Sequence, residues 1–241
     1  VTFGFDTEVQ PDTVVGLSLG YTSTEAEGTR TDTEIDSIQL TAYASKSKDN
    51  WYVNGTLGLA LNEFDTTRTV GTDRLNGDFD GTSYIASVAG GYTLENVPGP
   101  LQVTPRASVT YALSQLDDYT ETGSILGLNV DTDDSSKFET GLGLALEYPM
   151  TFSGVTYKPS LEFDWLYDFV GDEVETKSRF ASGAATTFNS KGADIAQHTF
   201  VVGAGLDVVT QDNLTVSLDY DLVNRQDYES HNGTLNARFN F

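Results

Sequence analysis

The chain has 241 residues, of which 38% are hydrophobic, and its 36 acidic and 13 basic residues give a formal net charge of −23. This acidity argues against a nucleic-acid partner, because phosphate binding needs a basic surface. The absence of cysteine excludes disulfides and thiolate sites, and no apolar run is long enough for a transmembrane helix.

Segments in which apolar and polar residues alternate follow one another along the whole chain. Near the C-terminus, Leu214, Val216 and Leu218 fall on one face while Thr215 and Ser217 fall on the other. A period of two is typical of β-strands, and no stretch shows the spacing of a helix. The sequence predicts about eleven strands, at 1–8, 13–22, 36–45, 51–61, 82–94, 100–113, 138–148, 157–169, 198–209, 214–222 and 232–241.

The connections between these strands alternate between short and long. The short ones are rich in turn residues and cover 9–12, 46–50, 95–99, 149–154 and 210–213. The long ones are more acidic and cover 22–34, 62–81, 114–137, 170–197 and 223–230. Strict alternation predicts that all short turns lie at one end of the sheet and all long loops at the other, which is the layout of an outer-membrane barrel.

A soluble β-sandwich also has one apolar and one polar face, so alternation alone does not decide between the two folds. Two features favour the barrel. The polar face carries charges deep inside the strands, which suits the wet lumen of a wide barrel. Aromatic residues also gather near strand ends, as in the girdles at both membrane surfaces; they include Tyr21, Trp51, Tyr92, Tyr111, Tyr148, Tyr157, Tyr167 and Tyr220.

The charged residues on the polar face form the candidate lumen lining. They are Arg106, Glu139, Glu147, Lys158, Glu162, Asp164, Asp207 and Asp219. Such a lining could hold a threading segment or favour cations. Alternatively, these residues could serve only the general need of a water-filled pore for polar side chains.

Barrels of one chain normally have an even number of strands. We therefore expect a twelfth strand, preceding Val1, that closes the sheet against the terminal strand. The fold class is then an all-β, transmembrane, antiparallel up-and-down barrel, with about eleven of its twelve strands present.

The chain resembles the C-terminal β-domain of autotransporters, the type V secretion family. The resemblance rests on the order and spacing of GLSLGYTST, NWYVNGTLGLALNEFDTTR, GDFDGTSYIASVAGGY, TPRASVTYA, FETGLGLALEY, PSLEFDWLYDF and the closing GTLNARFNF. It implies one barrel domain over 1–241 whose first strand, pore helix and passenger are not in this sequence. It also implies that Leu235, Phe239 and Phe241 form the signal read by the barrel assembly machinery.

The function that this resemblance implies is an outer-membrane anchor that exports or displays a passenger at the surface of a Gram-negative bacterium. The expected partners are outer-membrane lipid and lipopolysaccharide, the assembly machinery, and the protein's own passenger and pore helix. Short turns would face the periplasm and long loops the outside. An outer-membrane porin or small-molecule channel is the alternative.

Catalysis and cofactors find little support in the residues. A surface hydrolase at the rim could use His198 and His231 with Asp194 and Asp227, but no Gly-x-Ser-x-Gly nucleophile elbow occurs. The acidic stretches VDTDDSS and NGDFDG could attract Ca²⁺, and divalent cations could bridge them to lipopolysaccharide, but they lack the EF-hand spacing. We therefore expect no enzyme activity in the barrel, no metal site and no cofactor.

Overall fold

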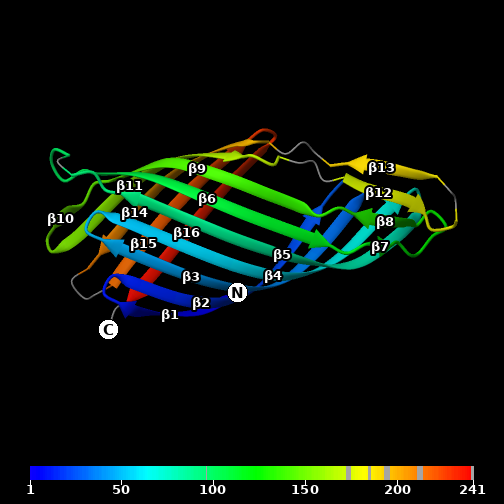
Figure 1. Cartoon of the computed structure of the whole chain (residues 1–241), viewed down its shortest axis with the longest axis horizontal. Coiled ribbons are helices and arrows are strands. Elements are labelled where there is room, and N and C mark those ends of the chain that lie inside the picture. Colours follow the sequence, from blue (N-terminus) through cyan, green and yellow to red (C-terminus); the bar gives the residue numbers. More distant parts are fainter. Residues whose placement is uncertain (96, 172–174, 184–185, 193–195, 211–213, 240–241) are drawn as a thin grey trace.

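A computed structural model describes residues 1–239 except 96, 172–174, 184–185, 193–195 and 211–213. Eleven strands follow one another in a single antiparallel sheet that curls about its long axis (Figure 1). In sheet order they are β1 (Thr2–Gln10), β2 (Thr13–Glu27), β3 (Thr31–Lys48), β4 (Trp51–Val70), β5 (Asp73–Tyr92), β6 (Gln102–Leu116), β9 (Ser135–Glu147), β11 (Val155–Asp168), β14 (His198–Val209), β15 (Leu214–Arg225) and β16 (Tyr228–Phe239). The eleven predicted strands are therefore confirmed.

One sheet edge is β1 and the other is β16, and sequence neighbours pair throughout except where excursions intervene. The turn between β9 and β11 contains a small hairpin, because β10 (Met150–Phe152) pairs with the start of β11. The tight turns between β1 and β2 and between β3 and β4 place an aspartate in the left-handed backbone region, with φ of 63° at Asp12 and 53° at Asp49. Aspartate is among the non-glycine residues that adopt this conformation most readily. The described part of the chain contains no helix with the length and apolar character needed to cross a membrane.

The long connections are where the sequence prediction was wrong. Three of the five, at 22–34, 62–81 and 223–230, are mostly strand, and the β4–β5 ladder runs unbroken to Val70 opposite Asp73. Both faces of these extensions carry polar residues, so the apolar alternation that identifies a strand is missing there. Backbone pairing to the preceding strands continues the ladder, and β-branched threonines suit it.

The other two long connections form a second, four-stranded sheet at the loop end of the molecule (Figure 1). Its strands are β7 (Tyr119–Thr120), β8 (Leu128–Thr132), β12 (Glu175–Phe180) and β13 (Thr187–Lys191), in the order β13-β12-β8-β7. Backbone bonds join it to β5, from Asp117 N to Asp80 O at 2.9 Å and through the Asn76–Thr122 bridge. We call this second sheet, with the adjoining ends of β4 and β5, the outer lobe.

The outer lobe contains the small buried core of the described chain. Leu75 is 1% exposed and Val130 is 6% exposed. The rings of Phe64, Phe79 and Tyr119 stack with centroids 4.8 and 4.4 Å apart. Burial, together with the nearby Glu121 charge, raises the pKa of Tyr119.

An ion pair completes this core. Arg68 donates through two nitrogens to Glu121, with Nε 2.7 Å from Oε1, and Glu121 also accepts the N–H of Leu128 at 3.0 Å. The Glu121 side chain is only 5% exposed, and the hydrogen bond to it raises the pKa of Arg68. A buried carboxylate is stable only when such partners satisfy it, so this pair fixes the segment around β7 onto β4.

Outside the outer lobe, many apolar side chains of the eleven main strands stay exposed. Leu57 is 64% exposed, Leu142 60% and Leu218 58%. A soluble protein would bury residues of this kind. An exposed apolar belt on one face of a curled sheet is what a lipid-facing barrel surface requires.

Candidate functional site

All eight predicted lumen residues lie on one face of the sheet. The register pairs Arg106 with Gly143, Gly143 with Asp164, and Lys158 with Asp207. Directly paired residues point to the same side, and so do residues two apart along a strand. The same rule places Glu139, Glu147, Glu162 and Asp219 on this face.

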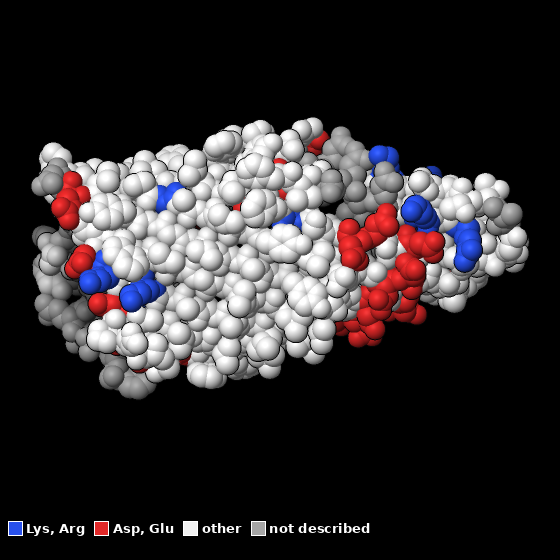
Figure 2. Space-filling view, in the orientation of Figure 1, with Lys and Arg blue, Asp and Glu red and all other residues white. Residues whose placement is uncertain are grey.

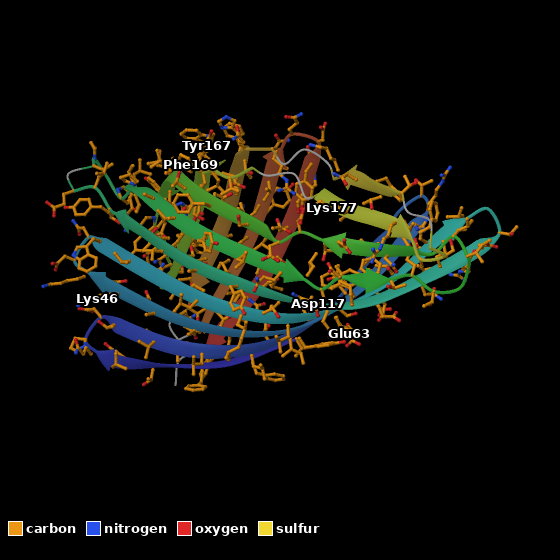
Figure 3. The ribbon with its side chains drawn as sticks, turned by 45° about the vertical axis from the view of Figure 1, so that its right-hand side comes forward. Lys46, Glu63, Asp117, Tyr167, Phe169 and Lys177 are labelled. Atoms are coloured by element: carbon orange, nitrogen blue, oxygen red, sulfur yellow. The ribbon has the colours of Figure 1, made fainter. Side chains whose placement is uncertain are left out.

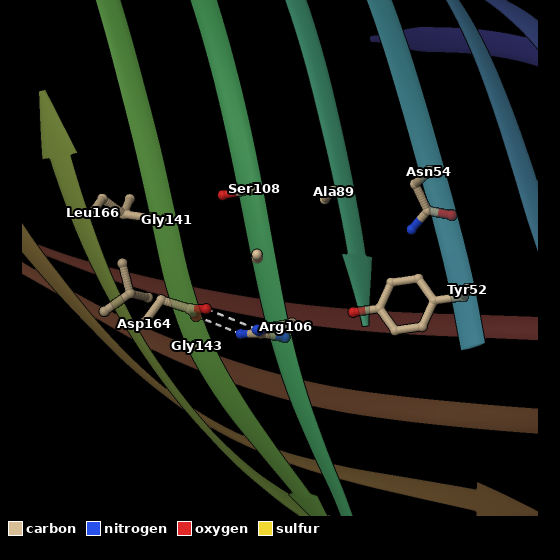
Figure 4. Close-up of a pocket in the computed structure, with 11 residues that line it drawn as sticks. Tyr52, Asn54, Ala89, Arg106, Ser108, Gly141, Gly143, Asp164 and Leu166 are labelled. Carbon is tan, nitrogen blue, oxygen red and sulfur yellow. Dashed lines mark hydrogen bonds and ion pairs between the residues drawn. The ribbon is translucent and has the colours of Figure 1, made fainter. Parts of the chain in front are cut away.

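This face is the concave one. Tyr52 on β4 and Asp164 on β11 line one cavity of about 330 Å³ although three strands separate theirs in the sheet (Figure 4). Side chains from such distant strands converge only on the side toward which a sheet curls. Leu142 and Phe163, of the opposite parity, are 60% and 49% exposed on the convex side.

Arg106 is the centre of the charged region. Its guanidinium donates from Nε to Asp164 Oδ1 at 2.7 Å and from Nη2 to Asp164 Oδ2, and Nη2 also lies 2.7 Å from Glu162 Oε2. Two parallel bonds from arginine to a carboxylate form a strong, directional contact. The contact joins β6 to β11 across the intervening β9 (Figure 4).

Gly143 makes this crossing possible. A Cβ at Gly143 would lie 1.9 Å from Asp164 Oδ1 and 2.9 Å from the carbonyl oxygen of Phe163. Any side chain there would displace the Asp164 carboxylate. The alternation of glycine and leucine in TGLGL was the sequence signal that could have identified this position, and the sequence interpretation did not use it.

The remaining predicted residues form smaller groups. Lys158 Nζ lies 3.6 Å from Glu147 Oε1, and Asp207 is the register partner of Lys158. Glu139 pairs at 2.6 Å with Lys137, a concave-face residue absent from the predicted set. Among the described residues Asp219 makes no ion pair, and its register partner is Gly205.

Further toward the loop end, the concave face carries a row of neutral side chains that runs from β3 to β6. Ser37 donates to Asn62 Oδ1 at 2.7 Å, Asn62 Nδ2 donates to Ser83 at 3.1 Å, and the Ser83 and Ser114 hydroxyls are 3.1 Å apart. This ladder of neutral hydrogen bonds crosses four strands. A second cavity of about 480 Å³ lies against it.

The histidines lie on the convex face, away from the charged region. His198 Nδ1 accepts the indole N–H of Trp165 at 3.0 Å. His231 contacts Tyr220 Oη at 2.6 Å and Glu229 at 2.8 Å. Asp227 is not a partner of either ring, and Asp194 lies outside the described residues.

Within the described ranges, no group of three or more histidine, aspartate or glutamate side chains is arranged to hold a metal ion.

Two residues of the predicted assembly signal, Leu235 and Phe239, lie on the edge strand β16. Leu235 is 75% exposed and Phe239 is 60% exposed, both on the convex face. Phe241 lies outside the described residues. The two described positions therefore present apolar side chains on the last strand of the described sheet.

Comparison with known proteins agrees with this architecture. Residues 1–221 match the family model described as the autotransporter beta-domain. Outer membrane protein B of Rickettsia prowazekii is 23% identical over the whole of this chain, which spans 16% of that relative. An extracellular serine protease of Serratia marcescens is 23% identical over 99% of this chain and 23% of its own length.

Solved structures show the same fold. The translocator domain of NalP from Neisseria meningitidis superposes with a TM-score of 0.80 at 18% identity, covering 100% of this chain and 79% of that one. The β-domain of the Bordetella autotransporter BrkA gives 0.71 at 16% identity, covering 98% and 86%. The domain is a β-barrel of the Gram-negative outer membrane. The chain belongs to the autotransporter beta-domain family.

Proposed function

We propose that this domain anchors a longer protein in the outer membrane and exports or displays that protein's passenger at the cell surface. The observation that carries the proposal is the division of one curled sheet into a polar concave face and an exposed apolar convex face. This arrangement provides a wet path through lipid. Family membership supplies the passenger as the cargo.

The charged residues of the concave face line that path. Arg106 and Lys158 are surrounded by carboxylates, so the wall has a net negative charge. The wall therefore favours cations and basic segments over anions. A barrel with an empty bore would conduct cations preferentially in a planar bilayer, and a measured anion preference would contradict this lining.

The barrel itself performs no catalysis in this proposal. The two histidines lie on the convex side with aromatic partners, away from the path. Replacing His198 or His231 with alanine should leave export intact and should remove no surface hydrolase activity.

Assembly machinery reads the final strand in this proposal, which is supported by the exposed apolar side chains that β16 carries at the end of the described sheet. The short turns face the periplasm and the outer lobe faces outside.

The test uses the full-length protein in cells. Passenger at the surface is measured by protease accessibility in intact cells, and barrel insertion by heat-modifiable gel mobility. Display should require the barrel, and deleting Phe241 should lower insertion. An inserted barrel whose passenger stays inside the cell would contradict the export proposal, and unchanged insertion without Phe241 would contradict the assembly signal.

A further inference from the structure

A cluster of aromatic side chains lies on the convex face at the loop ends of β9, β11 and β14. We call it the aromatic corner, and it consists of Phe138, Trp165, Tyr167, Phe169 and His198. Its ring centroids are 4.8 to 5.9 Å apart for the Tyr167–Phe169, Tyr167–His198, Phe138–Phe169 and Trp165–His198 pairs. Figure 3 shows Tyr167 and Phe169 side by side, pointing away from the sheet.

These rings are accessible from outside the sheet. Phe169 is 57% exposed and Trp165 is 41% exposed. Apolar lipid-facing residues such as Phe163 continue along β11 toward the turn end. The aromatic corner therefore lies where the apolar surface ends, at the depth of lipid headgroups.

The aromatic corner also carries hydrogen-bond donors without a protein partner. Indole N–H is only a donor, so His198 Nδ1 must be the acceptor of the Trp165 bond, and the proton of the neutral ring is on Nε2. Among the described residues, neither His198 Nε2 nor the Tyr167 hydroxyl has a hydrogen-bond partner. Both groups can donate to a ligand.

The loop ends of β3 to β6 carry negative charge on the convex face. Where the apolar surface of β3 to β6 ends, the convex face carries Asp36, Glu63, Asp65, Asp78, Asp80 and Asp117. Figure 2 shows the resulting acidic band, and Figure 3 shows Glu63 and Asp117 within it. By contrast, the convex-face positions of the described strands β9, β11 and β14 include no carboxylate. An anionic headgroup is repelled at the acidic band, whereas on the described convex face of β9, β11 and β14 it meets rings and hydrogen-bond donors and no carboxylate.

We infer that the aromatic corner is a binding surface for the phosphorylated sugar headgroup of an outer-leaflet lipopolysaccharide. Flat rings pack against sugar faces, and the His198 and Tyr167 donors reach phosphate or hydroxyl oxygens. The inference rests on the outward orientation of the loop end in the proposed function, and it does not depend on export of a passenger.

The test compares purified full-length variants reconstituted in nanodiscs with lipopolysaccharide. Retained lipopolysaccharide per protein is measured by native mass spectrometry. Tyr167→Ala with Phe169→Ala, and separately His198→Ala, should lower it by at least about fivefold. Tyr84→Ala is the matched control, because Tyr84 is a convex-face aromatic beside the acidic band and is 45% exposed.

Heat-modifiable mobility confirms folding of each variant, and His198→Gln, which keeps a donor, should restore most of the binding. Dephosphorylated lipopolysaccharide should bind the parent protein less well. Equal retention by all variants, or equal retention of phosphatidylglycerol and lipopolysaccharide at the aromatic corner, would overturn the inference. Passenger display in cells is scored separately, so its failure would count only against the export proposal.

Discussion

The two halves of the concave wall are held together by different chemistry. On β6, β9 and β11 an arginine reaches across a glycine to two carboxylates of a strand that is not its neighbour. On β3 to β6, neutral serine and asparagine side chains bond only between adjacent strands. Charged side chains therefore connect strands that the backbone ladder does not pair, whereas the neutral ladder only reinforces existing pairing.

The largest loss of stability should come from filling the space at Gly143, over which the Arg106 side chain reaches Asp164. Gly143→Ala places a Cβ against Asp164 and should break the Arg106 contact, at a cost of about 2–4 kcal/mol. Urea unfolding of the refolded domain in detergent measures the loss. Gly55→Ala is the control, because its Cβ would meet only Ser87 O, at 4.0 Å. Equal losses for the two variants would contradict the special role of Gly143.

The Arg68–Glu121 ion pair tests whether charge also stabilises the outer lobe. Arg68→Gln leaves the Glu121 carboxylate buried with its ionic partner removed, a change worth about 3 kcal/mol within the outer lobe. Limited proteolysis should then cut faster between 117 and 134, while the barrel stays folded. Arg74→Gln, at an exposed position of β5, should leave the cutting rate unchanged.

Substitutions in the neutral hydrogen-bond ladder of β3 to β6 should lower stability less. Asn62→Ala removes the centre of the ladder, with two hydrogen bonds, and should lower the free energy of unfolding by about 1 kcal/mol. Asn54→Ala removes a single bond, from Ser45, and should cost less. If Asn62→Ala lowered the free energy of unfolding as much as Gly143→Ala, the proposed difference between the two halves of the concave wall would be wrong.

The smallest effect concerns pH and the acidic band. A hydrogen bond with the facing Asp78 raises the pKa of Asp65 above its ordinary 3.8. The folded hairpin therefore holds a proton more firmly than the unfolded chain, and its stability falls as pH rises from 3.8 through the raised value. Amide exchange at the loop end of β4 and β5 should speed up over that window. Asp65→Asn should flatten the dependence, and exchange that instead slows with rising pH would contradict the assignment.

Periodicity was enough to predict the strands, because lipid on one side and water on the other impose an alternation of two residues on every spanning strand. The alternating loop lengths, the charges inside the strands and the aromatic residues near strand ends were needed to predict the barrel. Periodicity also predicted the face on which Arg106 and Asp164 meet. It did not predict the outer lobe, since strands such as the far ends of β4 and β5 have polar residues on both faces. Nor did it predict that Arg106 contacts Asp164 across Gly143. That contact depends on the register of β6, β9 and β11 and on the lack of a side chain at Gly143.

The most direct test of the central claim asks which face of the sheet meets water. The chain has no cysteine, so single replacements can be labelled cleanly in the membrane-inserted protein. Ser217→Cys, on the concave face, should react readily with a membrane-impermeant maleimide, and its neighbour Leu218→Cys should react only with a lipid-soluble reagent. Rapid labelling of Leu218→Cys from water with protection of Ser217→Cys would contradict the polar bore and the functions derived from it.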